Sequence, residues 1–108
     1  MPLPITPGQL VVVILREPKE RVWGRLLGLE DAGILVRGLD VLVWEETLAM
    51  VKRGERDHVA LGTRFFPMHR VESWYLDEPS SGVPSLEADL LRRTGLAAQD
   101  LLNDLENR

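Results

Sequence analysis

Two histidine–carboxylate pairs are the best candidates for chemistry in this 108-residue sequence. His69 lies three positions before Glu72, and Asp57 directly precedes His58. Such a pair moves protons only when both groups share a pocket with an oriented substrate, and nothing else in the sequence gathers around either pair. No serine stands in a nucleophile-elbow context, no glycine-rich loop cradles phosphate, and two isolated histidines are a weak metal signal. We therefore predict that the chain is not an enzyme, with no catalytic residue, metal ligand or cofactor.

Basic side chains form a second set of candidates, for contact with RNA. They are His69, Arg70, Lys52, Arg53, Arg56 and Arg64. A nucleic-acid binder usually presents a basic surface, because phosphate contacts supply most of its affinity. Glu55 and Asp57 are interleaved with the cations of the 52–56 segment, a pattern typical of a salt-bridged surface loop. The pattern is therefore compatible with an RNA site and favours the salt-bridged surface.

The composition is that of an ordinary globular protein, 44% hydrophobic and 28% charged, and its length suits one domain. The absence of cysteine excludes disulfides, a thiol nucleophile and cysteine-ligated zinc. The net charge is −4, and most of the excess acid lies after residue 77, which argues against a general nucleic-acid binder. The longest apolar run, Leu10–Leu15, is far too short to span a bilayer, and no cleavable leader is visible. We expect a cytoplasmic location and no membrane partner.

Five segments have the length, β-branched content and flanking turn residues of strands, and Gly24 and Gly28 suggest a sharp bend in the second. The segments are 10–15, 21–30, 34–43, 63–66 and 71–76. Short turns between them predict an antiparallel arrangement, because parallel neighbours need long crossovers. The predicted fold is mainly β, a five-stranded, strongly bent antiparallel small barrel over about residues 9–77. The connection at 44–62 is ambiguous between a strand and a single helical turn.

Aromatic residues occur at strand positions, where they serve either as stacking platforms for single-stranded nucleic acid or as core and interface anchors. They are Trp23, Trp44, Trp74, Phe65, Phe66 and Tyr75. Alternating strand positions favour the anchor interpretation. Trp74 and Tyr75 are neighbours on one strand and must point to opposite faces, so one of them needs a cover from another chain or from the C-terminal helices.

The last part of the chain differs from the strand-rich part. We assign residues 1–77 to the barrel, 78–84 to a linker and 85–108 to an amphipathic helical tail. Ser85 is a good N-cap and Gly95 a natural C-cap for a first short helix. Its expected apolar stripe is Leu86, Leu90 and Leu91, and that of a second helix is Leu96, Leu101, Leu102 and Leu105. Helices this short are marginal in water, so we predict that the tail folds back on its own barrel or on a neighbouring subunit. It is also a candidate contact for a protein partner.

The second and third predicted strands carry a pattern that resembles the first motif of the Sm-like (LSm) small β-barrel family: Gly24, Leu26, Glu30 and Leu35. The segment 66–73 is similar to the turn between the last two strands of the Hfq-like bacterial members, with His69 and Val71 as the matching positions. The resemblance covers about residues 9–77. Ile34 stands where Sm proteins have their base-reading asparagine, Met68 stands where the Hfq pattern has lysine, and no Arg-Gly pair follows.

The resemblance implies that the last strand pairs with a neighbouring subunit to close a ring. Apolar and aromatic residues of the last strand suit such an edge, and they make the expected oligomer interface: Val71, Trp74, Tyr75 and Leu76. It also implies that the turn at His69 and Arg70 lines a central pore, where donors could meet RNA. Because the RNA-reading residues are missing, the sequence predicts a self-assembling, non-catalytic protein-interaction module, with an RNA-binding ring as the alternative.

Overall fold

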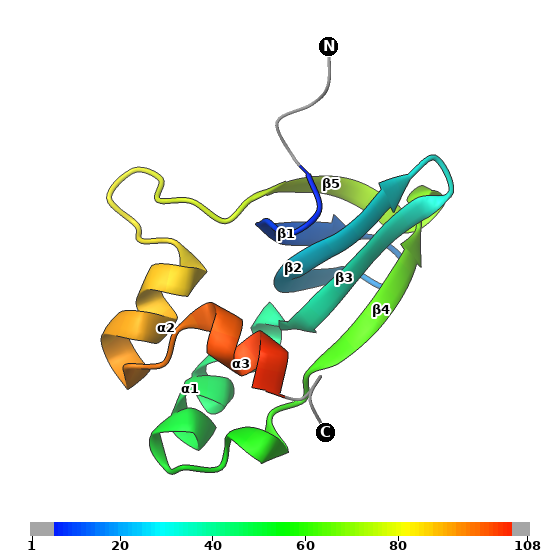
Figure 1. Cartoon of the computed structure of the whole chain (residues 1–108). Helices are drawn as coiled ribbons and strands as arrows, with labels where there is room; N and C mark the ends of the chain where they lie inside the picture. The colour runs from blue at the N-terminus through cyan, green and yellow to red at the C-terminus, as the bar shows by residue number, and fades with distance from the viewer. Residues whose placement is uncertain (1–5, 105–108) are drawn as a thin grey trace.

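The computed structural model describes residues 6–104 and contains one five-stranded antiparallel sheet in the order β4-β3-β2-β1-β5 (Figure 1). The strands are β1 (Leu10–Leu15), β2 (Glu20–Glu30), β3 (Gly33–Asp40), β4 (Gly62–Pro67) and β5 (Val71–Leu76). The predicted five-stranded antiparallel architecture is confirmed. Closure into a barrel is not seen: β4 and β5 are the two edges of the sheet, and no ladder joins them within the described residues.

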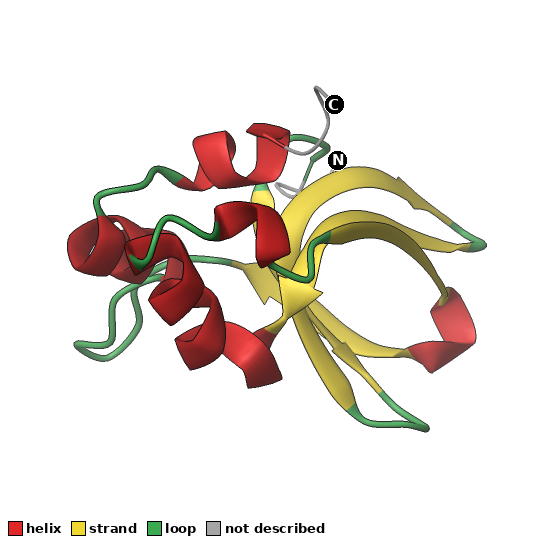
Figure 2. Cartoon of the chain, turned by 90° about the horizontal axis from the view of Figure 1, so that it is seen from below, coloured by secondary structure: helices red, strands yellow, loops and turns green. Residues whose placement is uncertain are grey.

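The sheet is strongly curved (Figure 2), and within it Gly24 of β2 pairs with Gly38 of β3. A Cβ atom on Gly24 would collide with the backbone of Arg37, and one on Gly38 with the backbone of Trp23. Only glycine allows the two strands to approach this closely. Gly28, predicted with Gly24 as a sign of a sharp bend, is not a site of close approach, because a Cβ atom there would have ordinary contacts. The register of β2 against β3 shifts between Leu26 and Gly28, which adds a bulge beyond the close approach.

Buried residues alternate between two hydrophobic clusters on opposite faces of the sheet. The sheet-interior cluster contains Val11, Val13, Leu15, Val22, Leu26, Ile34, Val36, Phe66 and Val71. The helix-side cluster contains Val12, Trp23, Leu39, Trp44, Leu48, Val59, Leu90, Ala98, Leu101 and Leu102. Because side chains alternate along a strand, the consecutive valines of β1 supply both clusters. The sheet and the C-terminal helices therefore share one of the two cores.

The ambiguous connection between β3 and β4 contains a helix, α1 (Trp44–Lys52), between the short 3-10 turns η1 (Val41–Val43) and η2 (Arg56–His58). The strand predicted over 34–43 is too long, because it ends at Asp40, whose carboxylate accepts the backbone N–H of Leu42 and caps η1. Glu45 and Glu46 in the first turn of α1 and Lys52 in its last complement the helix dipole. Trp44 and Leu48 are buried in the helix-side cluster, and this tertiary burial selects helix over strand.

The tail forms α2 (Leu86–Thr94) and α3 (Ala98–Asp104), and the three α-helices gather at one end of the sheet (Figure 2). Both caps are as predicted: the Ser85 hydroxyl accepts the N–H of Ala88 at 3.1 Å, and Gly95 is left-handed at φ 78°. Leu90, Leu101 and Leu102 are buried, which confirms that the tail folds back, here on its own sheet. Leu91 was predicted in the apolar stripe but points outward, 52% exposed. Leu105 lies outside the described residues.

Polar contacts fix the tail at several points. Asp77, just after β5, accepts the indole N–H of Trp23 and the backbone N–H groups of Leu86 and Glu87 that open α2. Buried Arg37 of β3 donates to the carbonyl oxygen of Leu102 at 2.9 Å. An arginine at the C-terminal end of α3 also complements the negative end of the helix dipole.

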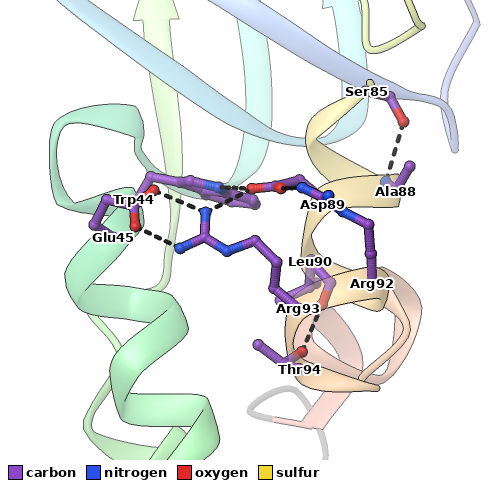
Figure 3. A network of polar contacts seen from close by, with 9 residues as sticks. All are labelled: Trp44, Glu45, Ser85, Ala88, Asp89, Leu90, Arg92, Arg93 and Thr94. Carbon is purple, nitrogen blue, oxygen red and sulfur yellow. Dashed lines mark hydrogen bonds and ion pairs between the residues drawn. The ribbon is translucent and has the colours of Figure 1, made fainter. Parts of the chain in front are cut away.

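The contact between α1 and α2 is a polar network around Asp89 (Figure 3). The indole N–H of Trp44 and the guanidinium groups of Arg92 and Arg93 all donate to its carboxylate. Burial pushes the pKa of Asp89 up, but these three donors together hold it below its ordinary value. Arg93 also pairs with Glu45 of α1, so one arginine connects the two helices.

No helix in residues 6–104 has the length and apolar character needed to cross a membrane.

Candidate assembly interface at the sheet edges

The predicted RNA-contact turn is η3 (Met68–Arg70), which joins β4 to β5 at the end of the sheet away from the helices (Figure 2). His69 is exposed. Arg70 is half-buried and donates to the carbonyl oxygens of Arg16 and Pro18, at 3.2 and 2.9 Å. Arg16 donates in return to the carbonyl oxygen of His69 at 3.1 Å. These bonds lock the β1–β2 hairpin against η3, so Arg70 faces its own chain.

Arg70 and Arg64 meet at one carboxylate, that of Glu20. Arg70 lies 3.0 Å from it and Arg64 3.5 Å. The Arg70 hydrogen bond is the main reason that the pKa of Glu20 lies below its usual value, because it stabilises the ionised carboxylate. The Arg64 guanidinium also lies 4.7 Å from the ring centroid of Phe66, a cation–π contact. The two arginines, both candidates for an RNA-binding patch, thus lie together around an acidic partner.

The other predicted cations, Lys52, Arg53 and Arg56, lie at the opposite end of β4, at the end of α1 and in η2 (Figure 1). The six residues of β4, about 20 Å of extended strand, separate His69 and Arg70 from this group, and Arg64 lies within β4. Arg53 pairs with Glu55 at 3.1 Å, an exposed contact of the kind expected for a salt-bridged loop. The structure therefore does not assemble the six predicted residues into one surface.

The histidine–carboxylate pairs are not assembled into a site in the described residues. His69, Glu72, Asp57 and His58 are all exposed, and no hydrogen bond or ion pair joins either pair within residues 6–104. In the same range, no three His, Cys, Asp or Glu side chains come together in an arrangement that could hold a metal ion. The arrangement therefore offers no positioned acid, base or ligand set.

The aromatic residues divide between the core and the sheet edges. Trp23, Trp44 and Phe66 are buried, as the anchor interpretation predicts. Trp74 is half-buried against the sheet-interior cluster, and Tyr75 is 45% exposed, so the two do point to opposite faces. The indole nitrogen of Trp74 is buried and has no hydrogen-bond partner among residues 6–104.

Both edges of the sheet carry an exposed aromatic side chain on the same face. Tyr75 on β5 pairs in register with Val12, which belongs to the helix-side cluster. Phe65 on β4, 48% exposed, precedes Phe66 of the sheet-interior cluster and so also points to the helix side. A Cβ atom on Gly33 would overlap the Phe65 ring, which shows that this ring lies across β3.

The predicted interface residues are therefore only partly available to a neighbour. Val71 is buried, and Trp74 and Leu76 are half-buried on the sheet-interior side, which leaves Tyr75 and the outer backbone of β5. Phe65, one of the aromatic residues considered as core or interface anchors, was not among the four predicted interface residues, and it is exposed on the other edge strand. Comparisons of the chain with protein-family models, with curated proteins and with solved structures found no match.

Proposed function

We propose that the chain is a non-catalytic, Sm-like assembly module whose copies join through the β4 edge of one subunit and the β5 edge of the next. The observation that carries the proposal is the pair of unpaired edges, each with an exposed aromatic residue on the helix side of the sheet, Phe65 and Tyr75. Unpaired strand edges are templates for pairing with another chain. The bent five-stranded sheet, with a close approach of β2 and β3 at the paired Gly24 and Gly38, supports the resemblance to the Sm-like family.

Pairing β5 with a neighbour's β4 would extend the sheet and bring Tyr75 beside Phe65 of the neighbour on a continuous face. Cross-strand aromatic pairs contribute about 0.2–1 kcal/mol each, in addition to the backbone hydrogen bonds. The two surfaces differ, so the contact is head to tail, and such contacts build a closed ring when the rotation closes.

The test uses two glutamate variants, F65E and Y75E, with L91E as the matched control at an exposed leucine of α2. Wild type and L91E should be oligomers by light scattering at tens of micromolar, and each edge variant should be a monomer. A mixture of F65E and Y75E retains one intact junction and should stop at a dimer containing one copy of each. A monomeric wild type would overturn the proposal, and a contact of β5 with β5 would leave F65E fully assembled.

The RNA-binding alternative is supported by the exposed His69 beside the cluster of Arg16, Arg64 and Arg70. It is the less favoured function for two reasons. Arg70 donates its hydrogen bonds to the β1–β2 hairpin of its own chain, and the negative charge of Glu20 offsets part of the positive charge of the arginines. Protein purified at low salt distinguishes the two functions. A ratio of absorbance at 260 and 280 nm typical of protein alone supports the assembly module, and co-purifying nucleic acid that is lost in H69A would support the alternative.

A further inference from the structure

A groove of about 320 Å³ lies where the end of β1 and the start of β2 face η1. Its apolar side chains are those of Ile14, Val41 and Leu42. Ile14 pairs in register with Arg21 of β2, so these two side chains lie together on one face of the sheet. The groove borders the Arg70–Glu20–Arg64 contact, because Glu20 is one of its lining residues, and neither Phe65 nor Tyr75 lines it.

Leu42 is the most exposed large apolar residue of the described chain, at 90%. It is also held in place, because the Asp40 carboxylate accepts its backbone N–H at 2.8 Å and fixes the η1 turn. A backbone that is already fixed at the rim of a groove does not have to be ordered when a ligand covers its side chain. The Leu42 side chain therefore suits a contact residue.

Cations outnumber carboxylates around the groove: Lys19 and Arg21 line it, and Arg64 and Arg70 contact its Glu20, against the two carboxylates of Glu20 and Asp40. Of its two carboxylates, Glu20 is bound by Arg70 and Arg64, whereas Asp40 accepts the N–H of Leu42 and keeps its negative charge. Its two cations, Lys19 and Arg21, are exposed and make no side-chain hydrogen bond or ion pair within residues 6–104. The groove thus presents three apolar side chains beside two cations, Lys19 and Arg21, that have no partner in residues 6–104.

We infer that this groove binds an acidic linear peptide that presents one apolar side chain next to carboxylates. Ile14, Val41 and Leu42 receive the apolar side chain, and Lys19 and Arg21 pair with the flanking carboxylates. The inference names the chemistry of the partner for the interaction module proposed above. It rests on that proposed role but not on edge-to-edge assembly, since all of these residues belong to one chain.

The test measures fluorescence anisotropy of a labelled pentapeptide, Asp-Glu-Leu-Glu-Asp, with the full-length protein. Two peptides with the same dye serve as comparisons: Asp-Glu-Ser-Glu-Asp lacks the apolar side chain, and Lys-Lys-Leu-Lys-Lys reverses the charge. The acidic leucine peptide should bind with a Kd in the range of roughly 10 μM to 1 mM. Both comparison peptides should bind about tenfold more weakly or worse, and raising the salt to about 0.5 M should weaken the acidic peptide, because screening reduces its ionic contacts.

Three variants map the site on the protein. L42S and the double variant K19E/R21E should each weaken the acidic leucine peptide about tenfold, while L91S, at the exposed leucine of α2, should not change it. All four positions are exposed, so the fold should survive the substitutions. The inference is wrong if the three peptides bind alike, if none binds at ~1 mM, or if L42S leaves the affinity unchanged. A change of oligomer mass in L42S without peptide binding would assign the groove to a second copy of the chain. Edge-to-edge assembly is tested by the oligomer mass and peptide binding by the anisotropy, so either proposal can fail while the other holds.

Discussion

Trp23 and Trp44 meet edge to face, with ring centroids 5.2 Å apart and planes inclined by 73°. Trp23 belongs to β2 and Trp44 opens α1, so the contact joins the sheet to the helical end of the molecule. The Trp23 indole N–H donates to Asp77, which also accepts N–H groups that open α2, and the Trp44 indole N–H donates to Asp89 within α2. An edge-to-face pair contributes about 0.5–1.5 kcal/mol beyond the area that it buries. The tryptophans therefore act as anchors that orient the tail.

Replacing Asp77 by asparagine should weaken the attachment of α2. The Asp77 carboxylate accepts three donors, from Trp23, Leu86 and Glu87, whereas an amide offers one oxygen and no charge. We expect D77N to lower the free energy of unfolding by about 1–3 kcal/mol in urea titrations. The neighbouring E78Q should change it by less than about 0.5 kcal/mol, because Glu78 is exposed. Equal effects of the two variants would contradict the capping role.

Replacing Arg70 by glutamine should destabilise the hairpin in a pH-dependent way. The Arg70 hydrogen bond lowers the pKa of Glu20 below 4.5, so this contact stabilises the fold above the unfolded pKa and is lost as the pH falls through the folded value. We expect R70Q to cost about 1–3 kcal/mol at pH 7, and the gap from wild type to narrow below about pH 4. H69A should match wild type throughout. A gap that stays constant from pH 7 to 3 would show that the backbone contacts of Arg70 dominate.

Replacing Gly38 by alanine should disrupt the bend. The added Cβ atom meets the backbone of Trp23 and Gly24, neither of which can rotate away as a flexible side chain would. We expect a loss of about 3 kcal/mol or more in thermal or urea unfolding. G62A is the matched control, because a Cβ atom at Gly62 has nothing within 4 Å. Similar stability of the two variants would exclude close approach as the reason for glycine at position 38.

Replacing Leu101 by alanine should cost about 2–5 kcal/mol, because this side chain is buried in the helix-side cluster. L91A, at 52% exposure, should cost less than about 1 kcal/mol. The burial occurs within one chain, so the loss measured in the monomeric F65E background should not depend on protein concentration. A concentration-dependent loss in that background would indicate that the tail packs on another subunit.

Local features were readable from the sequence. The β-branched run of Leu10–Leu15 predicted β1, and Ser85 and Gly95 predicted the ends of α2, because strand propensity and helix caps depend on neighbouring residues. The apolar spacing of Leu101 and Leu102 predicted a tail that needs a cover. Strand propensity, helix caps and apolar spacing each depend on a few neighbouring residues, and all three are found in the folded chain.

The remaining features depend on residues far apart in the chain. Helix α1 forms because Trp44 and Leu48 find a core made by the sheet and the tail, and local propensity alone left the segment ambiguous. Arg70 was predicted to face RNA, but Pro18 and Glu20, about fifty positions away, receive its donors. The sequence by itself therefore determined the strands, the caps and the amphipathic tail. Only the tertiary structure decided which polar groups are occupied and which surfaces stay free, because these depend on long-range contacts that periodicity does not encode.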